Sequence, residues 1–439
     1  PCAPPFRNWA GTAMSQPHAW VQPADEAELT ALLQRAAQEG RHVKVVGAGH
    51  SWSDIACTDG YLVNLDRMAR LVRVDRSRGP DQIYVTVQAG IRLHALIRAL
   101  QAHGLTLPVV GSVTQQSIAS AIATGTHGNA PALGNLSSRV VALRIALADG
   151  QIVDASPDEN SDLFYAGKVH LGALGILTAV TLHAVPAFSL REESQLVSID
   201  DVVATLPQIW RSAPYVKLWW LPHVSKVRIC RARPTTEPSN LSATAHFIDE
   251  HIVNRRIFAR VLDVSRRIPA IIPTMNRAVS AIYFRPSVRC GPNTSILPLP
   301  MPPAHEELEY AVPLVHAADV LSGLRDLIDH HRLRVNFLVE LRPVAADDAW
   351  LSPMHGRASL CATLCIGSNM GRHREIYFAE AERLLQRLSG RPHWGKTFTA
   401  DSRYLRAQFP HWDRFVALRD RLDPDRRFGN PFLSRVFGD

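Results

Sequence analysis

The sequence has little lysine, and this shortage shapes what its positive charge can mean. Only five of the 48 basic residues are lysines, namely Lys44, Lys168, Lys217, Lys226 and Lys396, and the other 43 are arginines. The arginines are scattered, without a dense basic block or interleaved stacking aromatics, so the net charge of +8 does not predict nucleic-acid binding. A compositional bias, as from a GC-rich genome, explains these arginines as well as an acidic partner does.

Paired cysteines and long apolar runs are also absent. The six cysteines form no CxxC pair and no zinc spacing, so we expect neither a disulfide framework nor a metal site. Cys361 and Cys365, four residues apart in an alternating apolar run, are interpreted as buried small side chains. No run reaches the roughly 18 apolar residues that span a bilayer, and the first thirty residues lack a signal peptide's basic start and apolar core. We therefore expect a cytoplasmic protein without a transmembrane segment.

What is present is the composition of a globular protein. Apolar residues make up 46% and charged residues 20%, and at about 150 residues per domain the 439 residues suggest two or three domains. Up to residue 185, helix and strand signals follow each other. Helices are predicted over 25–38 and 93–102, and strands over 42–46, 83–87, 140–147, 151–154 and 176–182.

After residue 185 the pattern changes. Irregular prolines and apolar helical stretches such as 252–262 fill residues 186–300, and four prolines within 298–303 form a stiff joint. Strands are then predicted over 309–315, 335–341 and 360–366, with helices over 317–331 and 377–388. The pattern predicts an α+β chain with a first domain (1–185), a second domain (186–390) and a C-terminal segment (391–439).

Three stretches of small residues lie in the first domain. Gly47-Ala48-Gly49 follows a predicted strand, where small residues let backbone amides approach a pyrophosphate. A Rossmann fingerprint needs a third glycine three positions later, and Trp52 stands there instead. A Rossmann fold is therefore not expected, while another phosphate-binding loop stays open. With 117–128 and 172–175, the three stretches favour an extended cofactor bound by backbone.

Four ionisable residues are candidates for chemistry. His50 follows the first small-residue stretch, although a lone histidine is usually a core or surface residue. Lys396 lies beside His393 in the sequence, and a surface position is its default interpretation. Glu340 and Arg342 alternate in an apolar strand, so their side chains share one face. Buried charges are seldom unpaired, and a structural salt bridge and a substrate clamp are equally compatible with this pair.

The segment 45–56, Val-Val-Gly-Ala-Gly-His-Ser-Trp-Ser-Asp-Ile-Ala, resembles the flavin-attachment segment of the vanillyl-alcohol-oxidase-type flavoproteins. It is most similar to the sugar-1,4-lactone oxidase branch, which includes gulonolactone, arabinonolactone and alditol oxidases. Five further segments resemble that branch in the same order. They are 123–128, 172–176, 309–313, the Glu-x-Arg strand at 340–342 and His-Trp-Gly-Lys at 393–396. The resemblance therefore covers nearly the whole chain.

The resemblance implies a two-subdomain FAD-binding domain of the PCMH type, an α/β cap domain with an antiparallel sheet, and a C-terminal segment that returns to the flavin domain. It implies that His50 carries FAD covalently through the 8α-methyl group. Attachment should be single, since no cysteine lies between Cys57 and Cys230. The residues expected to bind FAD are His50, Val45, Val46, Gly47, Ala48, Gly49, Ser51, Gly111, Ser112, Ser117, Ser120, Thr124, Gly125, Thr126, His127, Gly128, Gly175, Ile176 and His393.

The same resemblance assigns substrate contacts. Glu340, Arg342 and Lys396 match positions that hold substrate hydroxyls, and Ser112 matches a serine near the flavin's reactive edge. A carboxylate accepts a hydroxyl proton, and two cations steady alkoxide charge while hydride leaves for flavin N5. Thr363 and Cys365 match substrate-pocket positions. The position of Cys365 is commonly histidine or threonine, and that of Thr363 can carry a histidine in alditol oxidases, so no particular sugar lactone is carried over.

We therefore expect an FAD-dependent oxidoreductase acting on a CH–OH group of a polyol, an aldono-1,4-lactone or a sugar moiety. Gly111 matches a position where alanine hinders oxygen in dehydrogenase members, and glycine there favours reoxidation by O2 with release of H2O2. Turn geometry explains this glycine equally well. Three alternatives stay open: a dehydrogenase using a quinone or another acceptor, an enzyme tailoring a sugar on a larger natural product, and a flavin-bearing binding protein without turnover.

Overall fold

The computed structural model describes residues 3–438, apart from the side chains of residues 245, 246 and 250. Helix α1 (Glu26–Gln38) begins where the Asp25 side chain accepts a hydrogen bond from the backbone N–H of Glu28, and its apolar side packs into the core. It lies beside a parallel sheet of β3 (Ala19–Val21), β5 (Tyr61–Val63) and β4 (Val43–Val45), in that order. A hairpin of β1 (Phe6–Arg7) and β2 (Met14–Ser15) precedes it.

A second, antiparallel sheet completes the first domain. Its strands are β10 (Ile152–Ala155), β9 (Val140–Ala146), β11 (Ile176–Pro186), β7 (Ile83–Gln88) and β6 (Leu71–Asp75), with β8 (Leu105–Thr106) beside β11. Helices α2 (Leu93–Ala102), α3 (Ile118–Ala123) and α4 (Ser161–Gly167) and the 3-10 turn η1 (Leu136–Arg139) connect them. Strands β9 and β10, which match the predicted strands over 140–147 and 151–154, form an antiparallel hairpin with Asp149 and Gly150 in its turn.

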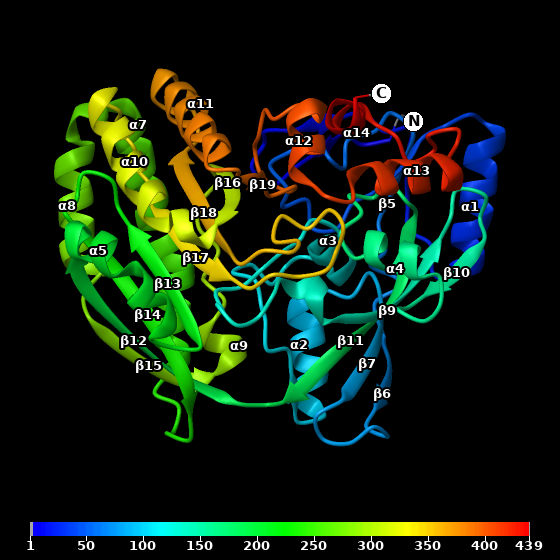
Figure 1. Cartoon of the computed structure of the whole chain (residues 1–439), viewed down its shortest axis with the longest axis horizontal. Coiled ribbons are helices and arrows are strands. Elements are labelled where there is room, and N and C mark those ends of the chain that lie inside the picture. Colours follow the sequence, from blue (N-terminus) through cyan, green and yellow to red (C-terminus); the bar gives the residue numbers. More distant parts are fainter. Residues whose placement is uncertain (1–2, 439) are drawn as a thin grey trace.

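The second domain is built on an eight-stranded antiparallel sheet (Figure 1). Its order is β15 (Ser287–Pro292), β12 (Ser189–Ser198), β14 (Lys226–Thr235), β13 (Tyr215–Trp220), β17 (Val339–Val344), β18 (Ser359–Gly367), β16 (His305–Pro313) and β19 (Arg391–Pro392). Helices α5 (Ile199–Arg211), α10 (Ala317–His330) and α11 (Arg372–Arg387) cover one face. On the central strands the side chains of that face are mostly apolar and buried, among them Leu218, Leu341 and Leu364, as period-two alternation predicts.

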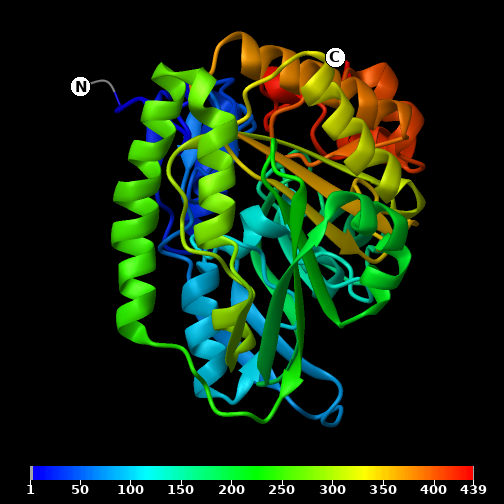
Figure 2. The same ribbon diagram turned by 90° about the vertical axis from the view of Figure 1, so that its left-hand side faces the viewer.

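The opposite face of this sheet is polar, and a helical hairpin lies over it (Figure 2). The hairpin consists of α6 (Ala243–Ile248), the π-helix η2 (Asp249–Phe258), α7 (Ala259–Arg267), the 3-10 turn η3 (Pro269–Ile271) and α8 (Ile272–Tyr283). Short α9 (Asn293–Ile296) follows β15, and η4 (Leu314–His316) follows β16. Within residues 3–438, we find no helix with the length and apolar character needed to cross a membrane.

The C-terminal segment joins both domains. Residues 391–397 extend the large sheet through β19 and a bridge between Leu308 and Thr397. Helices α12 (Ser402–Gln408), α13 (Trp412–Leu422) and α14 (Pro431–Phe437) then lie beside the first domain (Figure 1). Lys44 donates to the carbonyl of Phe428 over 3.1 Å. The boundaries at 185 and 390 stay predictions.

The α+β class and the main elements that the sequence predicts are confirmed, with three shifts in the second domain. Helix α11 begins at Arg372 and not at 377. Strand β16 begins at His305 and not at 309, because the polar run His305-Glu306-Glu307 conceals the start of the strand. Strand β17 begins at Val339 and not at 335. Hydrogen bonds of two asparagines replace strand pairing at residues 335 and 336. The Asn276 side chain donates to the carbonyl of Val335, and the Asn336 side chain accepts from the N–H of Gly367 and donates to the Ser265 hydroxyl.

Candidate active site

Three small-residue stretches, distant in sequence, line one pocket in the first domain. They come from the loop after β4, from α3 and from the loop before β11. The residues predicted to bind FAD that line this pocket are Val45, Val46, Gly47, Ala48, Gly49, His50, Ser51, Ser120, Thr124, Gly175 and Ile176.

Glycine is required at two places in this pocket wall. A Cβ at Gly47 would lie 2.4 Å from the Ser120 hydroxyl and 2.8 Å from that of Ser117. Gly175 has φ +152°, and a Cβ there would lie 2.5 Å from the carbonyl of Ala146. The wall thus exposes backbone and small hydroxyls, which is the chemistry that binds a pyrophosphate.

His50 presents an unpaired ring nitrogen in the pocket. Its Nδ1 is buried without a hydrogen-bond partner, and its ring lies 5.6 Å from that of Trp9. Burial, with the nearby charge of Lys396, lowers the pKa of His50 to about 4, so the ring is neutral at pH 7. A buried nitrogen lone pair without a partner fits a covalent bond to a cofactor. The residues present therefore fit FAD.

The other residues predicted to bind FAD lie outside this pocket. Ser117 is just behind the wall, with its hydroxyl 2.8 Å from that of Ser120. The buried loop with Gly111 packs against Thr126, and Gly128 packs against the carbonyl of Val110. Ser112 contacts Arg342, His127 contacts Glu309 and His393 lies beside His127, so these three residues lie at the polar face of the second-domain sheet. Gly125 packs against Pro353.

Glu340 and Arg342 point to the same face of β17, as alternation predicts. Arg342 Nε lies 3.3 Å from Glu340 Oε2, and Trp219 donates to Glu340 Oε1 over 2.8 Å. Arg342 also donates to the hydroxyls of Ser112, over 3.3 Å, and Thr363, over 3.0 Å. Four predicted residues from the two domains thus meet.

Lys396 reaches the same place from the C-terminal segment. Trp52 N–H donates to the carbonyl of Gly395 over 2.7 Å, which ties the His-Trp-Gly-Lys segment to the loop that carries His50. The Lys396 ammonium lies 4.1 Å from the centre of the Trp52 ring, and its side chain is only 16% exposed. The default interpretation as a surface lysine is therefore wrong.

Sequence reasoning missed two glutamates on β16 that face these cations. Glu307 forms a close ion pair with Lys396. Glu309 lies 3.4 Å from Arg342 and accepts a 2.9 Å hydrogen bond from Thr363. Burial alone would raise the pKa of Glu309, but His127 and Arg342 outweigh it and hold that pKa well below its usual value. Burial likewise lowers the pKa of Lys396, but Glu307 and Glu309 outweigh burial and raise that pKa above its usual value.

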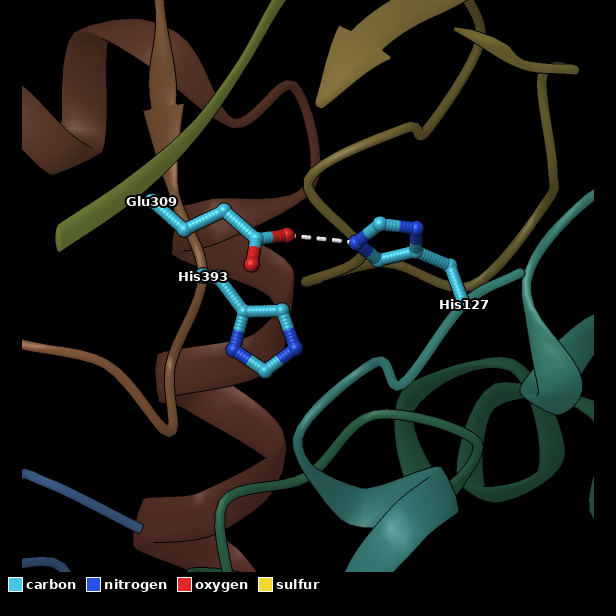
Figure 3. A group of neighbouring side chains, drawn as sticks. All are labelled: His127, Glu309 and His393. Atoms are coloured by element: carbon cyan, nitrogen blue, oxygen red, sulfur yellow. Dashed lines mark hydrogen bonds and ion pairs between the residues drawn. The ribbon is translucent and has the colours of Figure 1, made fainter. Parts of the chain in front are cut away.

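Each glutamate is held by a histidine whose two ring nitrogens both face oxygen. For His127 these are Glu309 Oε1 at 2.5 Å and the carbonyl of Gly128 at 2.9 Å (Figure 3). For His305 they are Glu307 Oε1 at 2.6 Å and the carbonyl of Pro303 at 2.8 Å. An ionised carboxylate only accepts, so each histidine donates from Nε2 to its glutamate. Two histidine–glutamate pairs therefore lie behind Arg342 and Lys396.

The same glutamates belong to two groups with metal-ligand geometry. Ligand atoms lie within 4.8 Å of one another in His127, Glu309 and His393, and again in His305, Glu307 and Cys365. Figure 3 shows Glu309 between the two histidines of the first group. Protein cations and hydrogen-bond donors already take up both carboxylates, and burial raises the pKa of the Cys365 thiol well above its usual value. Both groups are built as ion-pair networks.

Two family models match the chain. The first, described as an FAD binding domain, matches residues 17–156, and the second, described as D-arabinono-1,4-lactone oxidase, matches residues 180–436. The chain is 34% identical to the L-gulono-1,4-lactone dehydrogenase of Mycobacterium tuberculosis, covering 99% of this chain and 100% of that protein. It is 31% identical to the L-gulonolactone oxidase of Scyliorhinus torazame, with 98% of each covered.

Solved structures show the same fold. A solvent-stable cholesterol oxidase superposes with a TM-score of 0.85 at 20% identity, covering 99% of this chain and 97% of that one. The cholesterol oxidase of B. sterolicum gives 0.83 at 16% identity, covering 99% and 96%. The two-domain flavoprotein fold expected from the sequence is thereby confirmed. With these matches over both domains, the chain belongs to the D-arabinono-1,4-lactone oxidase family of FAD-dependent oxidoreductases acting on CH–OH groups.

Proposed function

We propose that the enzyme oxidises a CH–OH group of an aldono-1,4-lactone. The observation that carries this proposal is the meeting of Glu340, Arg342 and Lys396 beside the loop of His50, together with the lactones named in the relatives. FAD, when bound, accepts a hydride at N5 and passes the electrons to an acceptor. The test is anaerobic flavin bleaching with aldonolactones, polyols and glycosides. Bleaching by polyols or glycosides and not by lactones would redirect the substrate assignment.

The residues divide the work. Glu340 accepts the proton of the reacting hydroxyl, and Arg342 and Lys396 stabilise negative charge on its oxygen. We assign Glu307 and Glu309 as positioning residues, because they contact the two cations and keep them charged and aimed. Thr363 connects Glu309 to Arg342, and Cys365 lines an apolar corner with Phe337. A reducing, cytoplasmic setting is proposed too, since Cys57, Cys230, Cys290, Cys361 and Cys365 are all free and buried.

We propose a single covalent bond between His50 and FAD. Acid-denatured protein should then keep its yellow colour, whereas His50→Ala should release all flavin into the filtrate. His170 provides a matched control, because it lines the same pocket and also has a buried Nδ1 without a partner. We expect His170→Ala to retain bound flavin after acid. Free FAD from the acid-denatured wild type would contradict the bond.

We propose oxygen as the acceptor, based on Gly111. A Cβ at Gly111 would lie 2.8 Å from the Thr126 methyl carbon, with its next neighbours at 3.8 Å or more. The double variant Gly111→Ala/Thr126→Ser adds the methyl group without that collision and keeps the Thr126 hydroxyl. Stopped-flow mixing of the reduced double variant with aerated buffer should show reoxidation slowed about tenfold or more, which is about 1.4 kcal/mol in the barrier.

Thr126→Ser alone is the control and should reoxidise like the wild type. If wild type and double variant reoxidise at the same slow rate, oxygen access is not set at Gly111. A quinone or protein acceptor then becomes the better assignment.

A further inference from the structure

The helical hairpin, residues 243–283, carries most of the large exposed apolar side chains in the described part of the chain. Fifteen such side chains are exposed within residues 3–438, and nine of them lie in the hairpin. The most exposed are Ile282 at 67%, Phe247 at 56% and Ile257 and Ile268 at 53% each. A monomeric soluble protein rarely gathers apolar side chains in this way without a partner for them.

We call the outward side of the two helical arms, with these exposed side chains, the hairpin face. The Tyr283 hydroxyl donates to Asp249 Oδ1 over 3.1 Å, so the end of α8 lies against the start of η2. The 3-10 turn η3 joins the opposite ends. Exposed residues of both arms therefore lie near each other, and Figure 2 shows the two arms side by side along the surface of the second domain.

The hairpin face is also basic. Between residues 243 and 285 the sequence holds seven arginines and three acidic residues, a net charge of +4. Among the exposed arginines are Arg256 and Arg260, which sit within a few residues of Ile252, Ile257 and Val264. Long arginine side chains can lie along apolar surface while their charged ends stay in a polar layer.

The inner side of the hairpin is already used by the enzyme. Phe258 and Leu262 pack against Phe337 and Cys365, and the Phe284 ring lies 6.0 Å from that of Trp219. One side of the hairpin thus covers the polar face of the sheet. Its outward apolar side chains contribute nothing to that packing and need another explanation.

We propose that the hairpin face binds to the surface of an anionic lipid bilayer. Apolar side chains beside arginines on a helix lying flat are the pattern of interfacial membrane binding. The α6–α7 arm extends over 25 residues and suits a surface that is continuous in the plane. A second copy is a poorer occupant, because a two-fold interface would set this basic face against itself.

The experiment is cosedimentation of the FAD-loaded enzyme with phosphatidylcholine vesicles, with and without a minority of phosphatidylglycerol. We expect binding only to the anionic vesicles, and weaker binding as salt rises. Arg256→Gln and Arg260→Gln should each lower the partition coefficient about fivefold. Ile252→Ser/Ile257→Ser/Ile282→Ser should abolish sedimentation with vesicles.

Matched controls change exposed residues elsewhere: Met14→Ser/Val72→Ser/Val315→Ser for the apolar set, and Arg98→Gln/Arg403→Gln for the charged set. They should bind vesicles like the wild type. Equal loss in the control sets, or no binding to anionic vesicles, would overturn the proposal. So would a concentration-dependent dimer in sedimentation velocity that the triple serine variant makes monomeric, because a second copy would then cover the hairpin face. Melting curves and flavin spectra check that each variant is folded.

Discussion

Arg342→Ala is expected to slow anaerobic flavin reduction about 10²–10³-fold, the usual loss when one preorganised charge-stabilising donor is removed. Arg342 is buried, and it donates to Ser112 and Thr363 while it pairs with Glu340 and Glu309. The rate constant of reduction, measured at saturating substrate in a stopped-flow instrument, gives the effect directly.

Lys396→Ala should show a loss of similar size, because Lys396 supplies the second cation. Arg374→Ala is the matched control. Arg374, on α11, pairs with Glu306 on the helix-covered face of the large sheet, and it also lies over the Phe378 ring. It therefore makes an ion pair like that of Lys396, but on the opposite face of the sheet. Arg374→Ala should reduce flavin at the wild-type rate.

Removal of Arg342 leaves Glu309 and Glu340 buried without one of their cations, which costs stability as well as rate. Arg342→Lys separates the two effects, since it keeps the charge but loses the planar fork that contacts two hydroxyls at once. A folded Arg342→Ala variant with wild-type reduction would mean that Arg342 serves only as a structural ion pair. Wild-type reduction in Arg342→Lys alone would mean that the charge matters and the planar fork does not.

Strand alternation was enough to place Glu340 and Arg342 on one face, and it could have found Glu307 and Glu309 as well. Residues 305, 307 and 309 are His, Glu and Glu in alternation with 306, 308 and 310. Three of these six residues are charged, so the segment resembles a solvated strand. The structure buries both glutamates because their partners come from distant parts of the chain: the cations Arg342 and Lys396, and the histidine His127. No local pattern contains that information.

The pocket of the first domain was predictable in its composition but not in its full lining. Small residues at three places favoured a backbone-lined cofactor site, and the pocket unites them. Lys44 and His170 also line it, and no sequence signal selected them. Both are buried, and burial lowers the pKa of Lys44 to about 7. The hairpin face was not predictable either, since apolar helical spacing in 252–262 does not tell which side meets solvent.

Glu307→Gln is expected to move the alkaline limb of kcat/KM to lower pH. Lys396 must be charged to stabilise the substrate oxygen, so activity falls as pH rises through its pKa. Burial lowers that pKa, and the two glutamates raise it above its usual value. Without the Glu307 charge, the effect of burial is less opposed and the pKa of Lys396 falls. The groups that face Lys396 are Glu307, Glu309 and His305 on β16, Arg342 on β17, Cys365 on β18, His50 after β4 and His393 in its own segment.

Glu306→Gln is the matched control, because Glu306 is the next residue on β16 and pairs with Arg374 on the other face. Its pH profile should match that of the wild type. Glu307→Gln also leaves a buried ammonium with one carboxylate fewer, so its free energy of unfolding should fall by about 3–5 kcal/mol. A purely structural ion pair would lower stability alone. The shift of the alkaline limb, together with its return in Glu307→Asp, separates positioning of Lys396 from mere support of the fold, because only the former depends on a negative charge beside the ammonium.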